Sequence, residues 1–270
     1  MQCYKNGQLI DSIPLLDRAF HYGDGCFTTA RLVHGRMELK QLHIARLNYA
    51  CKNLSLDADL SYIEQALDQL SQHEKNLNGT LKVVISRGEG NRGYSLPLHA
   101  ADVYVWFYPK QWQHLEPEWI ESGLLNHAVG LHMPHLVGLK TLNRLEQVVL
   151  KQEADQRGWL EALVTDVQGY IVEGVSSNCF IRINDQWITP ELRYNGVHGV
   201  MRAHILSLMQ QNHISCEQRC IEMDQIAHIQ NIFFCNALHP MKAVVRFQGR
   251  TMQQQPYLDL FNSLKLSQID

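Results

Sequence analysis

Lys140 occupies an unusual place for a lysine, between an apolar run and a periodic segment. Residues 136–139 before it are apolar, and Leu142, Leu145 and Val148 follow it at helical spacing. Burial disfavours the charged form of an amine and lowers its pKa, and an amine that is uncharged near neutral pH can form a Schiff base with an aldehyde. The alternative is a solvated lysine before a helix, without a chemical role.

Glu173 and Arg46 are two further candidates for ligand binding. Glu173 ends a β-branched run and precedes a glycine. Its carboxylate is therefore either solvated at a strand end or directed at a cationic ring nitrogen. Arg46 lies near the apolar stripe of a helix predicted over residues 39–54. Its guanidinium either extends to solvent or binds an anion.

Two glycine-containing loops are candidates for receiving anionic groups. Residues 195–199 contain two glycines and open a helix predicted over 200–211. The free N–H groups at such a helix end suit a phosphate, although many helices follow glycine. Residues 87–95 contain three glycines and two arginines. This second loop is either a plain hairpin connection or a receptor for a carboxylate.

Hydroxyl and aromatic side chains gather between residues 17 and 30. Tyr22, Thr28 and Thr29 are of the types that line small-molecule pockets. The alternative for this stretch is a β-turn and a strand with no chemistry.

The composition is that of an ordinary globular protein. Of 270 residues, 45% are hydrophobic and 19% charged, and the net charge is −3. Neither half is strongly basic, so we expect no nucleic-acid partner. The longest apolar runs are strand-sized and the N-terminus lacks the apolar segment of a signal peptide. We therefore expect no membrane partner and a cytoplasmic location.

Cysteine and histidine spacing indicates neither disulfides nor a metal. The seven cysteines are scattered without a Cys-x-x-Cys pair, so we expect them to be reduced. His127, His132 and His135 cluster, but without the regular ligand spacing of a zinc site, and we predict no metal.

Periodicity predicts an α/β (α+β) chain of two domains. Residues 1–110 form a small N-terminal α/β domain with strands near 26–31, 80–86 and 102–109 and helices over 39–54 and 60–77. Prolines and an aperiodic stretch mark a linker at 111–117. Residues 118–270 form a larger C-terminal α/β domain that carries Lys140, with strands near 161–166, 170–174, 176–183, 187–190 and 231–235 and helices over 200–211 and 256–264.

One cofactor accounts for the separate candidates. Pyridoxal 5'-phosphate needs a lysine for its aldehyde, an anion that keeps its pyridine nitrogen protonated, and N–H donors with a guanidinium for its phosphate. Lys140, Glu173, Arg46 and the loop before residue 200 are of the types required. The sequence therefore predicts pyridoxal phosphate as the cofactor.

Six motifs spread over residues 17–240 carry a family resemblance. They lie at residues 20–31, 82–88 with 92–94, 139–147, 173–178, 196–202 and 235–237. In this order they resemble the fold-type IV pyridoxal-phosphate enzymes, the class of branched-chain and D-amino-acid aminotransferases. Within the class the chain is most similar to the bacterial aminodeoxychorismate lyases, because it has Phe-Thr-Thr-Ala-Arg at 27–31 where aminotransferases usually have Phe-Glu-x-x-Arg.

The resemblance implies a fold and a set of cofactor contacts. The fold is a two-domain one with the cofactor in the interdomain cleft, and the class is typically a homodimer. The implied cofactor-binding residues are Lys140 for the aldehyde, Glu173 for the pyridine nitrogen, and Arg46, Val200, Met201, Asn236 and Ala237 at or near the phosphate. Related aminotransferases often have a threonine where Met201 stands, so only the backbone N–H would serve there.

The resemblance also implies a reaction. A lyase of folate biosynthesis would convert 4-amino-4-deoxychorismate to 4-aminobenzoate and pyruvate. Lys140 would remove the C4 proton, Thr29 would relay a proton beside it, and enolpyruvate would leave from C3. The implied substrate-binding residues are Lys82, Arg92, Asn236, Tyr22 and Tyr94.

Two alternatives remain open from the sequence. A D-amino-acid or branched-chain aminotransferase on the same fold shares Lys140, Glu173 and the phosphate site. A non-catalytic binding protein that keeps the fold is the more remote alternative, since fold alone does not confer function.

Overall fold

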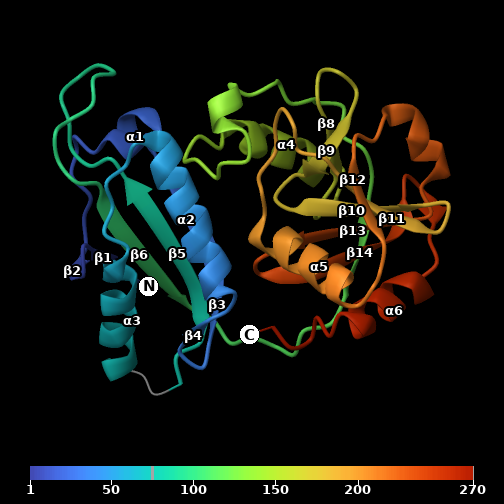
Figure 1. Ribbon diagram of the computed structural model, residues 1–270, viewed down its shortest axis with the longest axis horizontal. Coiled ribbons are helices and arrows are strands. Elements are labelled where there is room, and N and C mark those ends of the chain that lie inside the picture. Colours follow the sequence, from blue (N-terminus) through green and yellow to red (C-terminus); the bar gives the residue numbers. More distant parts are fainter. Residues whose placement is uncertain (74–75, 270) are drawn as a thin grey trace. The chain divides into compact units, whose positions relative to one another are not determined.

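The computed structural model describes residues 1–73 and 76–269, which form two compact units, each mixing sheet and helix (Figure 1). The first unit comprises Met1–Gln113 and Leu139–Asn143. The second comprises His114–Gly138 and Arg144–Ile269. The mixed α/β class predicted from the sequence is confirmed.

The first unit is built on a six-stranded antiparallel sheet in the order β2-β1-β6-β5-β3-β4. The strands are β1 (Gln2–Lys5), β2 (Gln8–Ile10), β3 (Gly25–Val33), β4 (Arg36–Met37), β5 (Gly79–Ser86) and β6 (Asp102–Pro109). Its helices are α1 (Arg18–Tyr22), α2 (Lys40–Leu54) and α3 (Ser61–His73). The helix predicted over 60–77 includes residues 74 and 75, which lie outside the described residues.

The two faces of this sheet carry different side chains, because successive residues of a strand point to opposite faces. On β3, Cys26 and Thr28 are buried on the face that α2 covers. Phe27 and Thr29 have the opposite parity and are only half-buried. The second face is therefore the one that displays side chains able to meet a ligand.

The segment around Lys140 extends the edge of β3 in the first unit. The N–H of Phe27 donates to the Lys140 oxygen (2.9 Å), and the N–H of Leu142 donates to the Gly25 oxygen (3.1 Å). An antiparallel bridge between Cys26 and Thr141 lies between these bonds. The segment groups with the first unit for this reason, although the sequence places it within the predicted second domain.

The second unit contains a seven-stranded sheet in the order β12-β11-β10-β13-β14-β15, with β7 paired in parallel to β14, and a separate β8-β9 hairpin. The strands are β7 (Glu118–Ser122), β8 (Leu163–Thr165), β9 (Ile171–Gly174), β10 (Asn178–Ile183), β11 (Gln186–Pro190), β12 (Cys216–Arg219), β13 (Asn231–Asn236), β14 (His239–Phe247) and β15 (Arg250–Thr251). The helices are η1 (Pro134–Leu136), α4 (Leu145–Gln156), α5 (Val200–Gln211), η2 (Met223–His228) and α6 (Gln255–Ser263).

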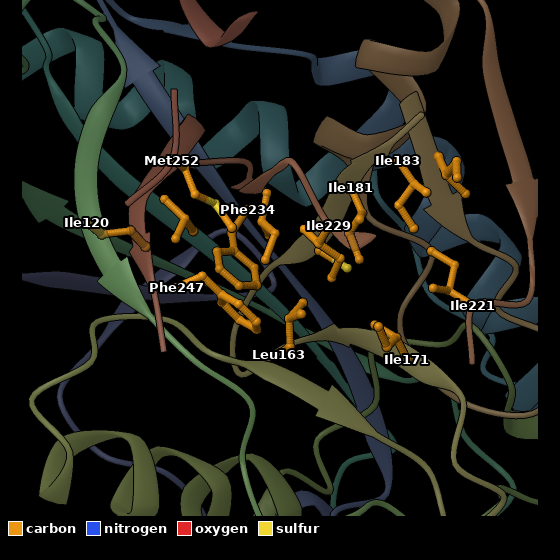
Figure 2. Packing of buried hydrophobic residues seen from close by; sticks show 14 residues of the cluster. Ile120, Leu163, Ile171, Ile181, Ile183, Ile221, Ile229, Phe234, Phe247 and Met252 are labelled. Atoms are coloured by element: carbon orange, nitrogen blue, oxygen red, sulfur yellow. The ribbon is translucent and has the colours of Figure 1, made fainter. Parts of the chain in front are cut away.

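A dense apolar core holds the second unit together (Figure 2). Leu163 of β8 and Ile171 of β9 meet Ile181 of β10 and Phe234 of β13 in one buried cluster. β-branched and aromatic residues of this kind fit a pleated surface that is covered on both faces. The core therefore fixes the ends of β9, β10 and β13, from which the candidate residues of this unit project.

The face that α4 buries differs from the one that the apolar spacing predicts. Leu145 and Val148 are 76% and 62% exposed, whereas Leu150, Glu153 and Ala154 are buried. The buried Glu153 accepts hydrogen bonds from the N–H groups of Asn126 (2.8 Å) and His127 (3.1 Å). These backbone partners stabilise a carboxylate at a buried position, which an apolar periodicity cannot reveal.

Candidate active site

Lys140 lies beside the ring of Phe27 in the first unit. Its Nζ is 4.6 Å from the centre of that ring, and the side chain is half-buried. A cation over an aromatic face is attracted to the ring, and the ring covers the aliphatic stem. The backbone pairing with β3 fixes where the side chain starts. Lys140 is therefore not fully solvated.

Thr29 and Lys82 share the sheet face of Phe27. They stand directly opposite each other in the β3-β5 ladder, so their side chains point the same way. Lys82 Nζ is 5.3 Å from the centre of the Phe27 ring. The structure therefore brings together Lys140, Thr29 and Lys82 around one phenyl ring.

Arg46 on α2 is a half-buried cation that forms no ion pair with any described residue. Its Nη2 donates to the hydroxyl of Thr28, while its buried Nε has no hydrogen-bond partner among the described residues. Burial lowers the pKa of Arg46 to about 10, and the one group that opposes this is the thiol of Cys26. A buried guanidinium is costly without an anion. This orphaned donor is what a phosphate would satisfy.

Thr28 and His43 hold the Arg46 guanidinium in place. The hydroxyl of Thr28 lies 2.5 Å from Nδ1 of His43. Burial, and then the positive charge of Arg46, lower the pKa of His43 to about 3, so the ring is neutral near pH 7. The Thr28 hydroxyl therefore accepts from Arg46 and shares a hydrogen bond with Nδ1 of His43. The sequence did not identify His43 as a candidate site residue. It suggested Thr28 only as a residue that could line a small-molecule pocket.

The loop that carries Arg92 is clamped by α1. The N–H of Gly93 donates to the phenol oxygen of Tyr22 (2.9 Å), and Arg18 Nη1 donates to the Gly93 oxygen (2.9 Å). Tyr22 also packs edge-on against Tyr94, with ring centres 5.6 Å apart. Arg92 is exposed on this loop. In the structure Tyr22 positions the loop, while Arg92 and Tyr94 are displayed by it.

His99 closes the base of the same loop. Its Nε2 lies 2.7 Å from the Glu89 oxygen and its Nδ1 lies 2.8 Å from the Ala100 oxygen. Both acceptors need a ring N–H, and only the imidazolium has two. These carbonyls raise the pKa of His99, with smaller contributions from Asp102 and Glu89.

Glu173 lies near the end of β9 in the second unit. Two donors bind one of its carboxylate oxygens. The N–H of Val197 (3.0 Å) and Nδ2 of Asn178 (3.1 Å) both donate to its Oε2. Asn178 Nδ2 also donates to the Val197 oxygen (2.9 Å), which ties the carboxylate to the loop before α5. Burial lowers the pKa of Arg144, and the charge of Glu173 opposes that effect. The carboxylate is thus oriented within a charged and partly enclosed setting.

The N-terminus of α5 offers backbone donors. Its N-cap is Gly199, which supplies no side-chain cap, and the first intrahelical bond runs from the Ala203 N–H to the Gly199 oxygen (3.0 Å). The N–H groups of Val200 and Met201 precede that bond, as at any helix start. A Cβ at Gly199 would collide with the amide oxygen of Asn178, so only glycine fits there. Backbone donors of this kind suit a phosphate.

Asn236 is held at both ends of its amide. Its Nδ2 donates to Oγ of Ser177 (3.0 Å), and its Oδ1 accepts from the N–H groups of Leu238 and His239 (3.0 Å each). The side chain thereby shapes the turn after β13, and the half-buried Ala237 follows in it. One proton of Nδ2 is left for a ligand.

The sequence did not single out the buried partners of these residues. Glu161 and Lys242 lie beneath the 174–178 turn, and Arg18 supports the loop of Arg92. The one available signal for Glu161 was a lone acid in the otherwise apolar stretch 160–164. Nothing local marks Lys242, because its partner is distant in sequence.

The described residues form neither a cluster of metal ligands nor a helix that could span a membrane. Residues 1–73 and 76–269 contain no group of three or more His, Cys, Asp or Glu side chains placed to hold a metal ion. No described helix is both long and apolar enough to cross a membrane.

Known proteins are similar to this chain over most of its length. Residues 25–247 match the amino-transferase class IV family. An aminodeoxychorismate lyase of Vibrio harveyi is 30% identical over 237 residues, 86% of each chain. A D-alanine aminotransferase of Bacillus licheniformis is 24% identical over 93% of this chain and 90% of its own. The crystal structure of 4-amino-4-deoxychorismate lyase from Pseudomonas aeruginosa superposes with a TM-score of 0.86 at 28% identity, covering 97% of this chain and 98% of that one.

The orphaned guanidinium gives a first testable prediction. Arg46→Met should weaken the binding of pyridoxal phosphate to the apoprotein by about 10- to 100-fold, because a hydrogen bond to a charged group contributes about 1.5–3 kcal/mol. Fluorescence titration of the apoprotein measures this. Arg36→Met, which changes an exposed arginine on β4 of the same unit, is the control and should bind normally. Equal affinity for the Arg46 variant and the wild type would contradict the assignment.

The doubly bonded His99 gives a pH prediction. Because its pKa is raised in the folded protein, the imidazolium should stabilise the loop fully below about pH 6.5 and lose that effect as the pH rises through the raised value. The difference in unfolding free energy between wild type and His99→Gln should therefore shrink from pH 5.5 to 8.5. His114→Gln, an exposed histidine outside the loop, is the control. A difference that is constant with pH would rule this anchoring out.

Proposed function

Because the chain belongs to the class IV aminotransferase family, we propose that it is a pyridoxal-phosphate-dependent lyase that converts 4-amino-4-deoxychorismate to 4-aminobenzoate and pyruvate. Lyases of that name are among its relatives at 30% identity and among its structural neighbours at 28%. A place in folate biosynthesis, the cytoplasm and a homodimeric assembly belong to the same proposal.

The residues described above are suited to bind pyridoxal phosphate. When bound, pyridoxal phosphate supplies an aldehyde and a ring that withdraws electrons from the substrate. Lys140 is the amine for the aldehyde, and Glu173, oriented by Val197 and Asn178, is the carboxylate that accepts from the pyridine N–H. Arg46 and the backbone N–H groups of Val200 and Met201 hold the phosphate, with Asn236 and Ala237 near it.

Thr28 and Thr29 together support the choice of a lyase. In the motif that usually reads Phe-Glu-x-x-Arg in aminotransferases, Thr28 stands at the glutamate position and Thr29 follows it, and their side chains point to opposite faces of β3. Thr28 is buried against Arg46 and His43. Thr29 is half-buried on the face that presents Lys140 and Lys82. A hydroxyl in this place is able to pass a proton beside the lysine without adding a negative charge.

The remaining residues handle the proton and the carboxylates of the substrate. Lys140 removes the proton from C4, and Thr29 lies on the same face to relay one. Lys82 and Arg92 bind the substrate carboxylates, and Tyr22 also positions the loop of Arg92. Asn236, Tyr22 and Tyr94 are the further residues of the substrate pocket in this proposal. Enolpyruvate then leaves from C3 as the ring becomes aromatic, so no second substrate is needed to accept an amino group.

An aminotransferase acting on a D- or branched-chain amino acid is the second candidate. The 24% identity to a D-alanine aminotransferase over 93% of the chain favours it, and Lys140, Glu173 and the phosphate residues serve both reactions.

The need for an amino acceptor separates the two functions. Purified protein supplied with 4-amino-4-deoxychorismate alone should release pyruvate and 4-aminobenzoate in equal amounts, detected by coupling to lactate dehydrogenase and by 4-aminobenzoate fluorescence. Lys140→Ala, which lacks the amine, is the control and should lose this activity by several orders of magnitude. Turnover that occurs only when a 2-oxo acid is added would establish the aminotransferase instead.

A further inference from the structure

Glu161, just before β8, is a completely buried carboxylate outside the proposed contacts. Its side chain is 0% exposed. It accepts hydrogen bonds from the Ser177 hydroxyl (2.7 Å), from the Ser176 N–H (3.1 Å) and from the Ser176 hydroxyl. A buried carboxylate is costly unless donors and a counter-charge satisfy it. All three donors come from one short turn of the chain.

Lys242 of β14 supplies the counter-charge. Its Nζ lies 3.6 Å from Oε1 of Glu161, and its side chain is 7% exposed. The lysine reaches the carboxylate from a different strand, since Glu161 precedes β8 and Lys242 pairs with Phe234 of β13. The ion pair therefore joins the main sheet of the second unit to the start of the β8-β9 hairpin.

The turn that Glu161 binds connects Glu173 to Asn178. It closes through a hydrogen bond from the Gly174 N–H to the Ser177 oxygen (2.7 Å). A Cβ on Gly174 would lie 2.9 Å from Oε2 of Glu161 and 2.7 Å from the Phe234 ring, so the turn packs directly on the carboxylate. Asn178, at the far end, donates to Glu173. The placement of both residues therefore depends on this turn.

Ser177 links Glu161 to Asn236 through two hydrogen bonds. Because its hydroxyl proton is donated to Glu161, its oxygen accepts from Nδ2 of Asn236 (3.0 Å). That bond fixes the nitrogen end of the Asn236 amide, whose oxygen end accepts from Leu238 and His239. The chain of bonds thus runs from the buried ion pair through one serine to a residue of the proposed cofactor site.

We propose that Glu161, paired with Lys242, is a positioning residue that sets both the Glu173 carboxylate and the Asn236 amide for the cofactor. It touches neither cofactor nor substrate and acts through Ser176 and Ser177. This inference rests on the proposed function in one respect, that the cofactor binds at Glu173.

The experiment compares a single and a double variant. Glu161→Gln keeps the size of the side chain but removes the charge and leaves Lys242 unpaired. Glu161→Gln/Lys242→Met removes both charges, so no buried charge is left alone. We expect Glu161→Gln to lower the melting temperature and to raise the dissociation constant of pyridoxal phosphate about tenfold or more. The double variant should recover much of the melting temperature but keep the weakened cofactor binding and a shifted absorbance maximum of the bound cofactor.

Glu153→Gln is the matched control in the same unit. Glu153 is also a buried carboxylate that accepts from backbone N–H groups and pairs with a cation, Arg157, but its hydrogen bonds and ion pairs among the described residues involve no residue of the 174–178 turn. It should lose stability and keep wild-type cofactor affinity.

Two results would overturn the inference. One is wild-type affinity and absorbance in Glu161→Gln, and the other is full recovery of affinity together with stability in the double variant, which would mean a purely structural role. Failure of the unaltered protein to bind pyridoxal phosphate would instead contradict the proposed cofactor, and the inference with it. Because binding and absorbance are measured without substrate, an error in the lyase assignment alone would leave this result unaffected.

Discussion

The second unit is organised around one carboxylate, Glu173, which is held in a fixed orientation near the end of a strand. An anion that is partly removed from water has to be given hydrogen-bond donors in place of solvent. Val197 and Asn178 supply them from two different segments, so the loop before α5 and the start of β10 are fixed by the same oxygen. The glycine at 199 follows from this packing, because the Asn178 amide occupies the space of a side chain there.

The first unit contains a charge of the opposite sign, the guanidinium of Arg46, in a place with little access to water. Arg46 is oriented by the hydroxyl of Thr28, and Thr28 is oriented in turn by the neutral ring of His43. The guanidinium is left with a buried donor and no carboxylate among the described residues, a cost that an anionic ligand removes. The first unit therefore contains a buried donor that an anionic ligand would satisfy, and the second contains a carboxylate oriented by a backbone N–H and an amide.

The sequence predicts the residues with distinctive local settings and misses those defined by long-range pairing. Lys140 before a helix, Glu173 before a glycine and the glycine loop at 195–199 are all visible from neighbours in the chain. The pairing of Lys140 with β3, the Glu161–Lys242 ion pair and the support of Arg46 by His43 join segments that periodicity treats as independent. Leu145 and Val148 are exposed although their spacing predicts a buried face, because the spacing of apolar residues does not show which other segments cover them.

Lys140 is proposed as the amine that holds the cofactor, and Lys82 is the informative competitor because it lies by the same Phe27 ring. Borohydride reduction of the protein with bound pyridoxal phosphate, followed by mass spectrometry of its peptides, identifies the modified lysine directly. We predict a stoichiometric phosphopyridoxyl group on Lys140 and none on Lys82. Modification of Lys82 instead, or of neither lysine in protein that retains the cofactor, would contradict the account.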